Sequence, residues 1–395
     1  MLVRSRTPVS PRDPNVNAAF DRYRKAAESG DLASPELSEA YRAEAMAEAM
    51  RVWADVMAPR RLWRRRVLLV GGGGYIGVPL AQQLLRSGYD VLNVDCFVYG
   101  HAMASVSLLG QDGYDLRRID FTRTADLKPL LSGVSDVIIL AGLVGDPITK
   151  KFSAESDIIN DKGIGDLIDA CNGQELNKVI FVSTCSNYGE ISDGVLAGED
   201  HKLKPLSSYA RAKVKQEQYL KEKDFDFHWT VLRFATAFGL APRMRFDLTV
   251  NQFTRELFLG IPVEVYDAET WRPYCHVRDF ARALVRVLEA PVARVARTVF
   301  NTGGDANNFT KSMILDAIGQ RVPHAQFKLV SGGGDRRNYR VDFSRIRNAL
   351  SFEPRYSIQD GIEETIRALQ LGYFSDYDSN RDLYGNYNVS YAKPC

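Results

Sequence analysis

The sequence predicts an α/β protein with a doubly wound parallel sheet, a smaller C-terminal lobe and a helical N-terminal extension. From residue 67 onward, short β-branched runs alternate with helical stretches, which indicates parallel strands covered by helices on both faces. After about residue 240 the strand-like runs become sparser and the loops longer. The preceding extension is rich in Ala, Arg and Glu and contains no strand-like run. We therefore expect the extension over 1–66, the main sheet domain over 67–240, and mainly the smaller lobe with the C-terminal tail over 241–395.

Length and composition exclude several classes of protein. The chain has 395 residues, of which 45% are hydrophobic and 25% charged, the usual mixture for a folded globular protein. A formal net charge of +2 provides no overall field for holding DNA or RNA, and no apolar run is long enough to span a membrane. The start of the sequence lacks the apolar core of a secretory signal, and the five cysteines show no CxxC spacing. We therefore expect a cytoplasmic protein with no metal site, no membrane association and no nucleic-acid partner.

The extension carries the signals of an added helix. Ser34 and Pro35 are typical of a helix start, and apolar residues then recur at helical spacing until Pro59. We interpret this helix as packing on the body of the protein or on a second subunit, with a partner-binding role as the alternative. The arginine cluster over 60–66 is interpreted as a solvated helix end. Its alternative is a nucleic-acid contact, which would show itself as salt-dependent binding to DNA.

The main domain follows in a regular order of strands and helices. A β-branched run at 67–70 predicts the first strand, and a helix is expected at about 75–87, closed by Gly88. Each later strand is a short apolar run, and helical stretches lie between them. These further strands are expected at 91–95, 136–141, 178–183 and 231–234.

Between the first strand and the first helix lies a glycine motif, Gly71–Gly77, with the spacing GxxGxxG. Glycines at this place permit a tight turn and let backbone N–H groups approach a pyrophosphate at the positive end of the helix. Asp95 ends the next strand, where it can accept hydrogen bonds from an adenosine ribose. No Arg or Lys directly follows it, so NAD is favoured over NADP as the cofactor. Asp120, after the third strand, is expected either to contact adenine or to cap a helix.

A second motif, Tyr209 and Lys213, has the spacing YxxxK. On a helix, residues four apart share a face. A tyrosine has an unperturbed pKa near ~10, and a nearby ammonium group lowers it, so this pair is typical of a tyrosine base with its tuning group. Upstream, the segment 183–189 follows a strand and contains Thr184, whose hydroxyl can orient a substrate alcohol for Tyr209.

Taken together, these motifs resemble the extended short-chain dehydrogenase/reductase family, the NAD-dependent nucleotide-sugar epimerases and dehydratases. The resemblance covers about residues 67–370 and implies a Rossmann-type fold. The segment 243–248 resembles the start of the family's substrate lobe. The specific motifs occur in the family's order: the glycine motif, the acidic strand end at Asp95, Leu140-Ala141-Gly142, Tyr188-Gly189, and Tyr209 with Lys213.

By this resemblance, Thr184 orients the sugar, Tyr209 is the acid/base, and Lys213 holds the nicotinamide ribose. Paired arginines suit a diphosphate because their forks bind its oxygens bidentately. Surface ion pairs are the alternative for the arginines named below, and a helix cap is the alternative for Asn251. The implied cofactor contacts are Gly71, Gly74, Tyr75, Ile76, Gly77, Asp95, Asp120, Leu140, Ala141, Gly142, Tyr209 and Lys213. The implied substrate contacts are Thr184, Cys185, Ser186, Thr236, Asn251, Arg272 and Arg337, the last three gripping the diphosphate.

Two departures from the family pattern narrow the reaction. The 4,6-dehydratases follow the threonine with Asp-Glu, whereas this chain has Cys185 and Ser186, so dehydration is disfavoured. Thr236 stands where the 4-epimerases often carry Asn, which leaves the nucleotide open.

We therefore expect NAD-dependent oxidation at a hydroxyl, C4, of a nucleotide-diphosphate sugar, with redox-neutral epimerisation as the net result. A nucleotide-sugar 4-oxidase or 4-ketoreductase is the alternative reaction. A catalytically silent NAD-binding regulator is the alternative of another class. The resemblance also implies a homodimer, paired through helices of the first domain.

Overall fold

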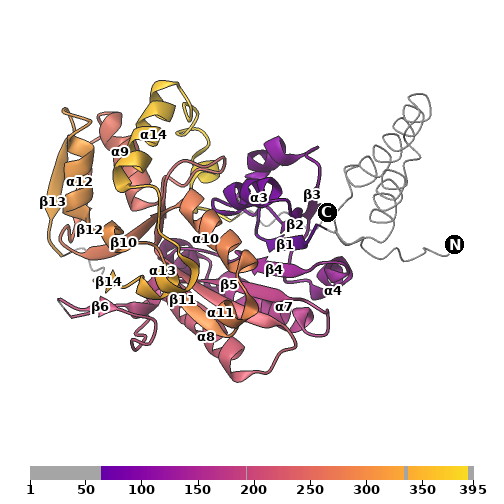
Figure 1. The fold of residues 1–395 in the computed structure, drawn as a ribbon. Helices are drawn as coiled ribbons and strands as arrows, with labels where there is room; N and C mark the ends of the chain where they lie inside the picture. The colour runs from indigo at the N-terminus through magenta and orange to yellow at the C-terminus, as the bar shows by residue number, and fades with distance from the viewer. Residues whose placement is uncertain (1–63, 193, 333–336, 390–395) are drawn as a thin grey trace, which may run out of the picture. The chain divides into compact units, whose positions relative to one another are not determined.

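The structure, a computed structural model, describes residues 64–192, 194–332 and 337–389 (Figure 1). The chain divides into two units, residues 1–64 and 65–395, and the second contains all that follows. The expected helix of the extension and the first two arginines of its cluster, Arg60 and Arg61, lie outside the described residues. The first strand, β1, already begins at Arg66, one residue before the expected boundary. Arg65 beside it does not end a solvated helix, because its Nε donates to the buried Asp136 at 3.0 Å.

A seven-stranded parallel sheet forms the centre of this unit, in the order β11-β7-β5-β4-β1-β2-β3. The order reverses between β1 and β4, which is the switch point where doubly wound sheets bind ligands. The predicted doubly wound α/β fold is confirmed. The strands are β1 (Arg66–Val70), β2 (Asp90–Asp95), β3 (Tyr114–Arg118), β4 (Asp136–Ile139), β5 (Lys178–Thr184), β7 (His228–Phe234) and β11 (Thr298–Thr302).

Alternating side chains of the strands feed two hydrophobic cores, one on each face of the sheet. In β1, Val67 and Leu69 join the core formed with α3 and α10, whereas Leu68 and Val70 join the core formed with α7. The helices and turns around the sheet are α3 (Gly77–Arg86), η1 (Ala102–Leu108), α4 (Thr124–Leu127), η2 (Lys128–Leu131), α5 (Asp146–Lys151), α6 (Ser153–Ser156), η3 (Asp157–Gly163), α7 (Ile164–Cys171), η4 (Cys185–Tyr188), α8 (Ser208–Glu222), α10 (Val277–Glu289), α11 (Val292–Val295) and α13 (Ser344–Leu350).

The smaller lobe has small sheets and a core of its own, and its orange and yellow elements stand at the left of Figure 1. The residues beyond 240 do not all belong to this lobe, because β11 and α10 return to the large sheet. The lobe elements are β6 (Leu196–Ala197), β8 (Thr236–Phe238), α9 (Thr249–Phe258), β9 (Val263–Tyr266), β10 (Trp271–His276), η5 (Asp305–Asn307), β12 (Asn308–Thr310), α12 (Lys311–Gly319), β13 (Phe327–Val330), β14 (Arg340–Val341) and α14 (Ile358–Gln370).

Residues 371–389, called here the C-terminal segment, leave α14 and include the short turn η6 (Arg381–Tyr384). The segment is fastened to both parts of the unit. The backbone N–H of Phe246 donates to the carbonyl of Tyr384 at 2.8 Å, and Asn386 donates to the carbonyl of Val144, beyond β4, at 2.8 Å. Among the helices of the described ranges, none is long and apolar enough to cross a membrane.

Candidate active site

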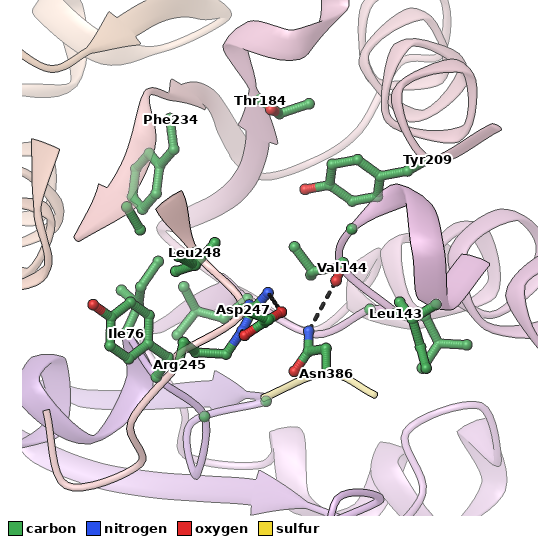
Figure 2. A pocket seen from close by; sticks show the side chains of 18 of the residues that line it. Ile76, Leu143, Val144, Thr184, Tyr209, Phe234, Arg245, Asp247, Leu248 and Asn386 are labelled. Atoms are coloured by element: carbon green, nitrogen blue, oxygen red, sulfur yellow. Dashed lines mark hydrogen bonds and ion pairs between the residues drawn. The ribbon is translucent and has the colours of Figure 1, made fainter. Parts of the chain in front are cut away.

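A cavity of about 550 Å³ lies at the carboxyl ends of β1, β2, β4 and β5. This volume is within the range of roughly 300–1,000 Å³ that is usual for small-molecule sites. Its walls come from the glycine motif, from the start of α8, from the segment after β8 and from the C-terminal segment. Figure 2 shows the arrangement, with Tyr209 directing its hydroxyl into the cavity and Thr184 nearby. Most of the predicted site residues therefore line this cavity at the switch point of the sheet.

The glycine motif forms the turn between β1 and α3. Gly71 adopts φ +84°, and a Cβ there would stand 2.8 Å from the backbone of Ala141. A Cβ on Gly77 would stand 2.5 Å from the backbone of Gly72, so both glycines are required sterically. The turn thus presents the start of α3 to the cavity, as a dinucleotide diphosphate needs. All predicted cofactor residues line the cavity: Gly71, Gly74, Tyr75, Ile76, Gly77, Asp95, Asp120, Leu140, Ala141, Gly142, Tyr209 and Lys213.

Two carboxylates stand on the cofactor side of the cavity. Asp95 accepts hydrogen bonds from the N–H groups of Gly73 at 2.9 Å and Phe97 at 2.8 Å. Burial raises the pKa of the Asp95 carboxyl, and these two bonds act against that shift. Asp120 accepts from the N–H of Thr122 at 3.0 Å and from its hydroxyl at 2.8 Å. Asp120 therefore closes a turn and lines the cavity but does not cap a helix, because α4 begins at Thr124 without a side-chain cap, and its contact with adenine stays a prediction.

The reacting centre joins the end of β5 to the first turns of α8. Thr184 accepts a hydrogen bond from the N–H of Ser186 at 3.1 Å and also interacts with the hydroxyl of Tyr209. Lys213, buried one turn further along α8, donates from Nζ to the carbonyl of Val182 at 2.7 Å. The structure thus brings Thr184, Tyr209 and Lys213 together at one cavity.

The electrostatics of this centre differ from the simple expectation. Burial raises the pKa of Tyr209, and the largest charge effect that lowers it comes from Arg245 rather than from Lys213. Burial also lowers the pKa of Lys213 to about 7, against the smaller opposing effect of Glu217. The tuning of Tyr209 by Lys213 stays a prediction, and Arg245 is the cation that acts on Tyr209.

A buried polar network supports the reacting centre from behind. Glu217 accepts from Arg233 at 2.7 Å and 3.1 Å, from the Ser183 hydroxyl at 2.5 Å and from Asn187 at 2.8 Å. The network ties β5, η4, β7 and α8 together, and thereby fixes Thr184 relative to Tyr209. Sequence reasoning missed it, although a charged Arg233 inside an apolar strand was a visible signal.

Two predicted substrate residues do not line the cavity, and their expected contacts need correction. Cys185 is buried, its Sγ lies 3.2 Å from the carbonyl of Arg233, and burial raises the pKa of its thiol. Asn251 is fully buried and bonds to the N–H of Gly239 at 3.0 Å, to the Tyr75 hydroxyl at 2.9 Å and to a backbone carbonyl. Asn251 therefore fastens the segment after β8 to the glycine motif, and its neighbour Gln252 lines the cavity instead.

The remaining predicted substrate residues do line the cavity: Thr184, Ser186, Thr236, Arg272 and Arg337. Arg337 forms an ion pair of 2.9 Å with Asp146, so the ion-pair alternative and a place in the cavity hold together. Arg272 is buried, and its guanidinium carbon lies 5.1 Å from the ring centroid of Tyr339. The two arginines are close, since Arg272 donates to the backbone carbonyl of Arg337.

Several cavity residues carried no predicted role. Arg245 and Asp247 form a two-bond pair at 2.7 Å and 2.6 Å, seen in Figure 2 beside Asn386. The motif 243–248 marked these residues as lobe residues only. Arg381, Asn386 and Tyr387 reach the cavity from the C-terminal segment, and no sequence motif indicated them. In the described part of the chain, no group of three or more His, Cys, Asp or Glu side chains is arranged to hold a metal ion.

The family model described as "NAD dependent epimerase/dehydratase family" matches residues 67–303. The uncharacterized UDP-glucose epimerase YtcB of Bacillus subtilis is 27% identical, over 78% of this chain and 99% of its own. A dTDP-glucose 4,6-dehydratase of Actinoplanes is 28% identical, over 76% of this chain and 96% of its own.

Among solved structures, a UDP-glucuronic acid 4-epimerase from Bacillus cereus, in complex with UDP-glucuronic acid and NAD, superposes with a TM-score of 0.68. It is 26% identical, and the match covers 78% of this chain and 100% of that one. In this chain the glycine motif, the acidic strand end at Asp95 and the residues Thr184, Tyr209 and Lys213 border one cavity. The protein therefore belongs to the NAD dependent epimerase/dehydratase family and is an NAD-dependent enzyme of the nucleotide-sugar epimerase class.

Proposed function

We propose that the protein oxidises the C4 hydroxyl of a nucleotide-diphosphate sugar and reduces the resulting ketone from the opposite face, so that the net reaction is epimerisation. The observation that carries this proposal is the pair of hydroxyls of Thr184 and Tyr209, beside Lys213, in a cavity that continues to Arg272 and Arg337. One end of this cavity suits a reacting alcohol and the other suits a diphosphate.

The residues present fit NAD. The glycine motif offers backbone N–H groups to the diphosphate, Asp95 offers carboxylate oxygens to the adenosine ribose, and Lys213 stands where it can hold the other ribose. When bound, NAD supplies the acceptor and donor of the hydride. The chain's own contribution is to bind, orient and exchange a proton.

Tyr209 is the proposed acid/base. In its phenolate form Tyr209 accepts the proton of the sugar hydroxyl, and the resulting phenol returns that proton when the ketone is reduced, so no external proton is consumed. Burial raises the pKa of Tyr209, so its phenolate needs stabilisation, and Arg245 and the Thr184 hydrogen bond both act in that direction. Thr184 also aligns the sugar hydroxyl with the phenol oxygen.

Dehydration is less well supported than epimerisation. A 4,6-elimination needs an acid and a base beyond the tyrosine, at the two positions after the threonine. Cys185 lies outside the cavity lining, with its thiol against a backbone carbonyl, and Ser186 lies 3.3 Å from the hydroxyl of Tyr339. A serine without an activating base is a poor proton acceptor. The similarity to a dTDP-glucose dehydratase therefore does not carry over as a reaction.

The test is substrate interconversion by the Tyr209→Phe variant. We expect wild-type protein to interconvert the C4 epimers of a UDP sugar such as UDP-glucose or UDP-glucuronic acid, followed by proton NMR. Tyr209→Phe should lose activity by about 10²-fold or more while still binding NAD. The matched control is Tyr219→Phe, on the same helix, whose hydroxyl bonds to Asp169 at 2.7 Å. Full activity in Tyr209→Phe would contradict the proposed role.

The alternatives make different measurable predictions. A 4-oxidase or 4-ketoreductase would consume external NAD or NADH in proportion to product, whereas an epimerase would not. A silent NAD-binding regulator would show no hydride exchange with any nucleotide sugar. We further propose that the protein is a cytoplasmic homodimer. Light scattering on the purified chain would test the homodimer by measuring the mass of the particle in solution, which should be twice that of one chain.

A further inference from the structure

Arg243 is a buried cation in the wall of the cavity. Its exposed fraction is 4%, and its guanidinium carbon lies 4.7 Å from the ring centroid of Tyr99. It donates to the carbonyl of Gly385 at 3.2 Å and to the side-chain oxygen of Asn386 at 2.7 Å, both of them uncharged acceptors. Burial and the neighbouring charge of Arg245 lower the pKa of Arg243 to about 10, which still leaves it protonated at neutral pH.

Three polar atoms beside this guanidinium lack hydrogen-bond partners among the described residues. They are Nε of Arg243, the hydroxyl of Tyr99 and Nδ1 of His101, and all three side chains line the cavity. His101 also places its Nε2 3.9 Å from Asp95, the carboxylate expected at the adenosine ribose. Buried polar atoms are nearly always paired in folded proteins. Their clustering in a cavity wall therefore indicates a ligand, and a buried guanidinium whose direct hydrogen bonds go only to uncharged acceptors, with the carboxylates of Asp95 and Asp247 acting on it from further away, favours an anionic group there.

The position of Arg243 favours the diphosphate of the dinucleotide over that of the sugar nucleotide as the anion bound there. Its segment is fastened to the glycine motif, because the hydroxyl of Tyr75 donates to the carbonyl of Gly239 at 2.5 Å and Asn251 donates to Tyr75. Arg243 thus shares the cavity end that contains the glycine motif and Asp95. The arginines at the other end, Arg272 and Arg337, approach from β10 and from the 337–340 region.

We propose that Arg243 binds the diphosphate of the dinucleotide from the lobe side of the cavity, and that the C-terminal segment positions it for this task through Gly385 and Asn386. Asn386 connects three parts of the molecule, since it also donates to the carbonyl of Val144 at 2.8 Å (Figure 2). The dinucleotide is then held between α3 and a clamp made of Arg243 and Asn386. The proposal depends on the NAD cofactor of the family and not on which sugar reacts.

The first experiment measures the dissociation constants of NAD, ADP-ribose and UDP by titration calorimetry on the full chain. Arg243→Gln should weaken NAD and ADP-ribose about tenfold or more, because a charge-assisted bond to a diphosphate is lost, and leave UDP within about threefold. Arg243→Lys, which keeps the charge, should recover part of the affinity.

Any of four outcomes would overturn the proposal: unchanged NAD affinity, weakening of NAD without weakening of ADP-ribose, weakening of UDP alone, or equal weakening of all three ligands. The melting temperature of each variant without ligand is measured alongside. Arg243→Gln removes a buried charge, so its unliganded melting temperature should stay close to that of the wild type.

The second experiment tests the segment through the rate at which NAD leaves the protein. Asn386→Ala should raise that rate several-fold, because Arg243 loses its shortest hydrogen bond. The matched control is Asn380→Ala, an exposed residue of the same segment, whose side chain bonds only to Asp376 among the described residues. Equal NAD release from both variants would overturn the clamp, as would an unchanged rate in Asn386→Ala.

Discussion

The buried pair Glu217 and Arg233 offers the sharpest test of how the site is held together. Both side chains are 1% exposed, and Glu217 accepts hydrogen bonds from three different side chains. Glu217→Gln keeps the shape of the side chain but leaves the charge of Arg233 without its carboxylate. Removing one partner of a buried ion pair costs about 3–5 kcal/mol, because the other charge stays buried without compensation.

For a folded unit of about 330 residues, such a loss lowers the melting temperature by roughly 4–7 °C. Differential scanning calorimetry measures it, with Lys215→Gln as a control for an exposed ion pair on the same helix, expected to change little. The double variant Glu217→Gln with Arg233→Met removes both charges and should recover part of the loss.

The site responds to the same substitution. Glu217 acts to raise the pKa of Lys213, so Glu217→Gln should lower that pKa further, which NMR titration of the Lys213 ammonium group would measure. A melting temperature within about 2 °C of the wild type would refute the reasoning that the pair is a strongly coupled buried interaction. Loss of stability without recovery in the double variant would show that Met cannot fill the site.

The remaining predictions concern backbone, proton linkage and positioning. Gly71→Ala should abolish NAD binding, because its Cβ would collide with the backbone of Ala141 at 2.8 Å. The control is Gly88→Ala, which has a similar φ of +82° but no atom within 4 Å of the added Cβ. It should lower the free energy of unfolding, measured by denaturant titration, by only about 1–2 kcal/mol and keep NAD binding. Lys213 has a folded pKa of about 7, below its unfolded value of ~10.4. The unfolded chain therefore binds more protons between these two values, and the free energy of unfolding should rise with pH across that window. In Lys213→Met the slope of the free energy of unfolding against pH, measured by urea titration, should be smaller. Asn251→Ala should lower stability by about 1–3 kcal/mol and weaken NAD binding through Tyr75, and unchanged calorimetric values for both would contradict its assigned place.

Local patterns in the sequence were sufficient to predict the glycine turn and five of the seven strands of the sheet, whereas β3 was given no range and β11 lies in the part assigned to the smaller lobe. The strands are short β-branched runs separated by helical stretches, and the demand for glycine at Gly71 arises because Ala141 follows β4, the strand that pairs with β1. The spacing of Tyr209 and Lys213 places both on one helix, and the structure brings them to the same cavity. These features depend on contacts that the periodicity of strands and helices already implies.

The parts that were missed depend on side-chain direction or on distant contacts. Cys185 and Ser186 are neighbours at the start of one short helix, yet only Ser186 faces the cavity, and the same holds for Asn251 and Gln252. Spacing alone does not tell which of two neighbouring side chains faces the cavity when the residues lie in a short helix or in the first turn of a longer one. Asn386 meets Val144 across 242 positions of sequence, a contact that no local pattern encodes.

The bond between Asn386 and Val144 has a consequence for how the molecule matures on the ribosome. Strand β4 and the loop after it are synthesised long before residue 386 leaves the exit tunnel. The early strands can pair as soon as they emerge, but the cavity wall formed by the C-terminal segment is complete only after α14 and the residues that follow it have been synthesised. A polypeptide shortened before Tyr377 should therefore collapse into much of the same sheet and yet keep nucleotide only briefly. A bulky fusion attached just beyond residue 389 should disturb nucleotide retention before it disturbs folding.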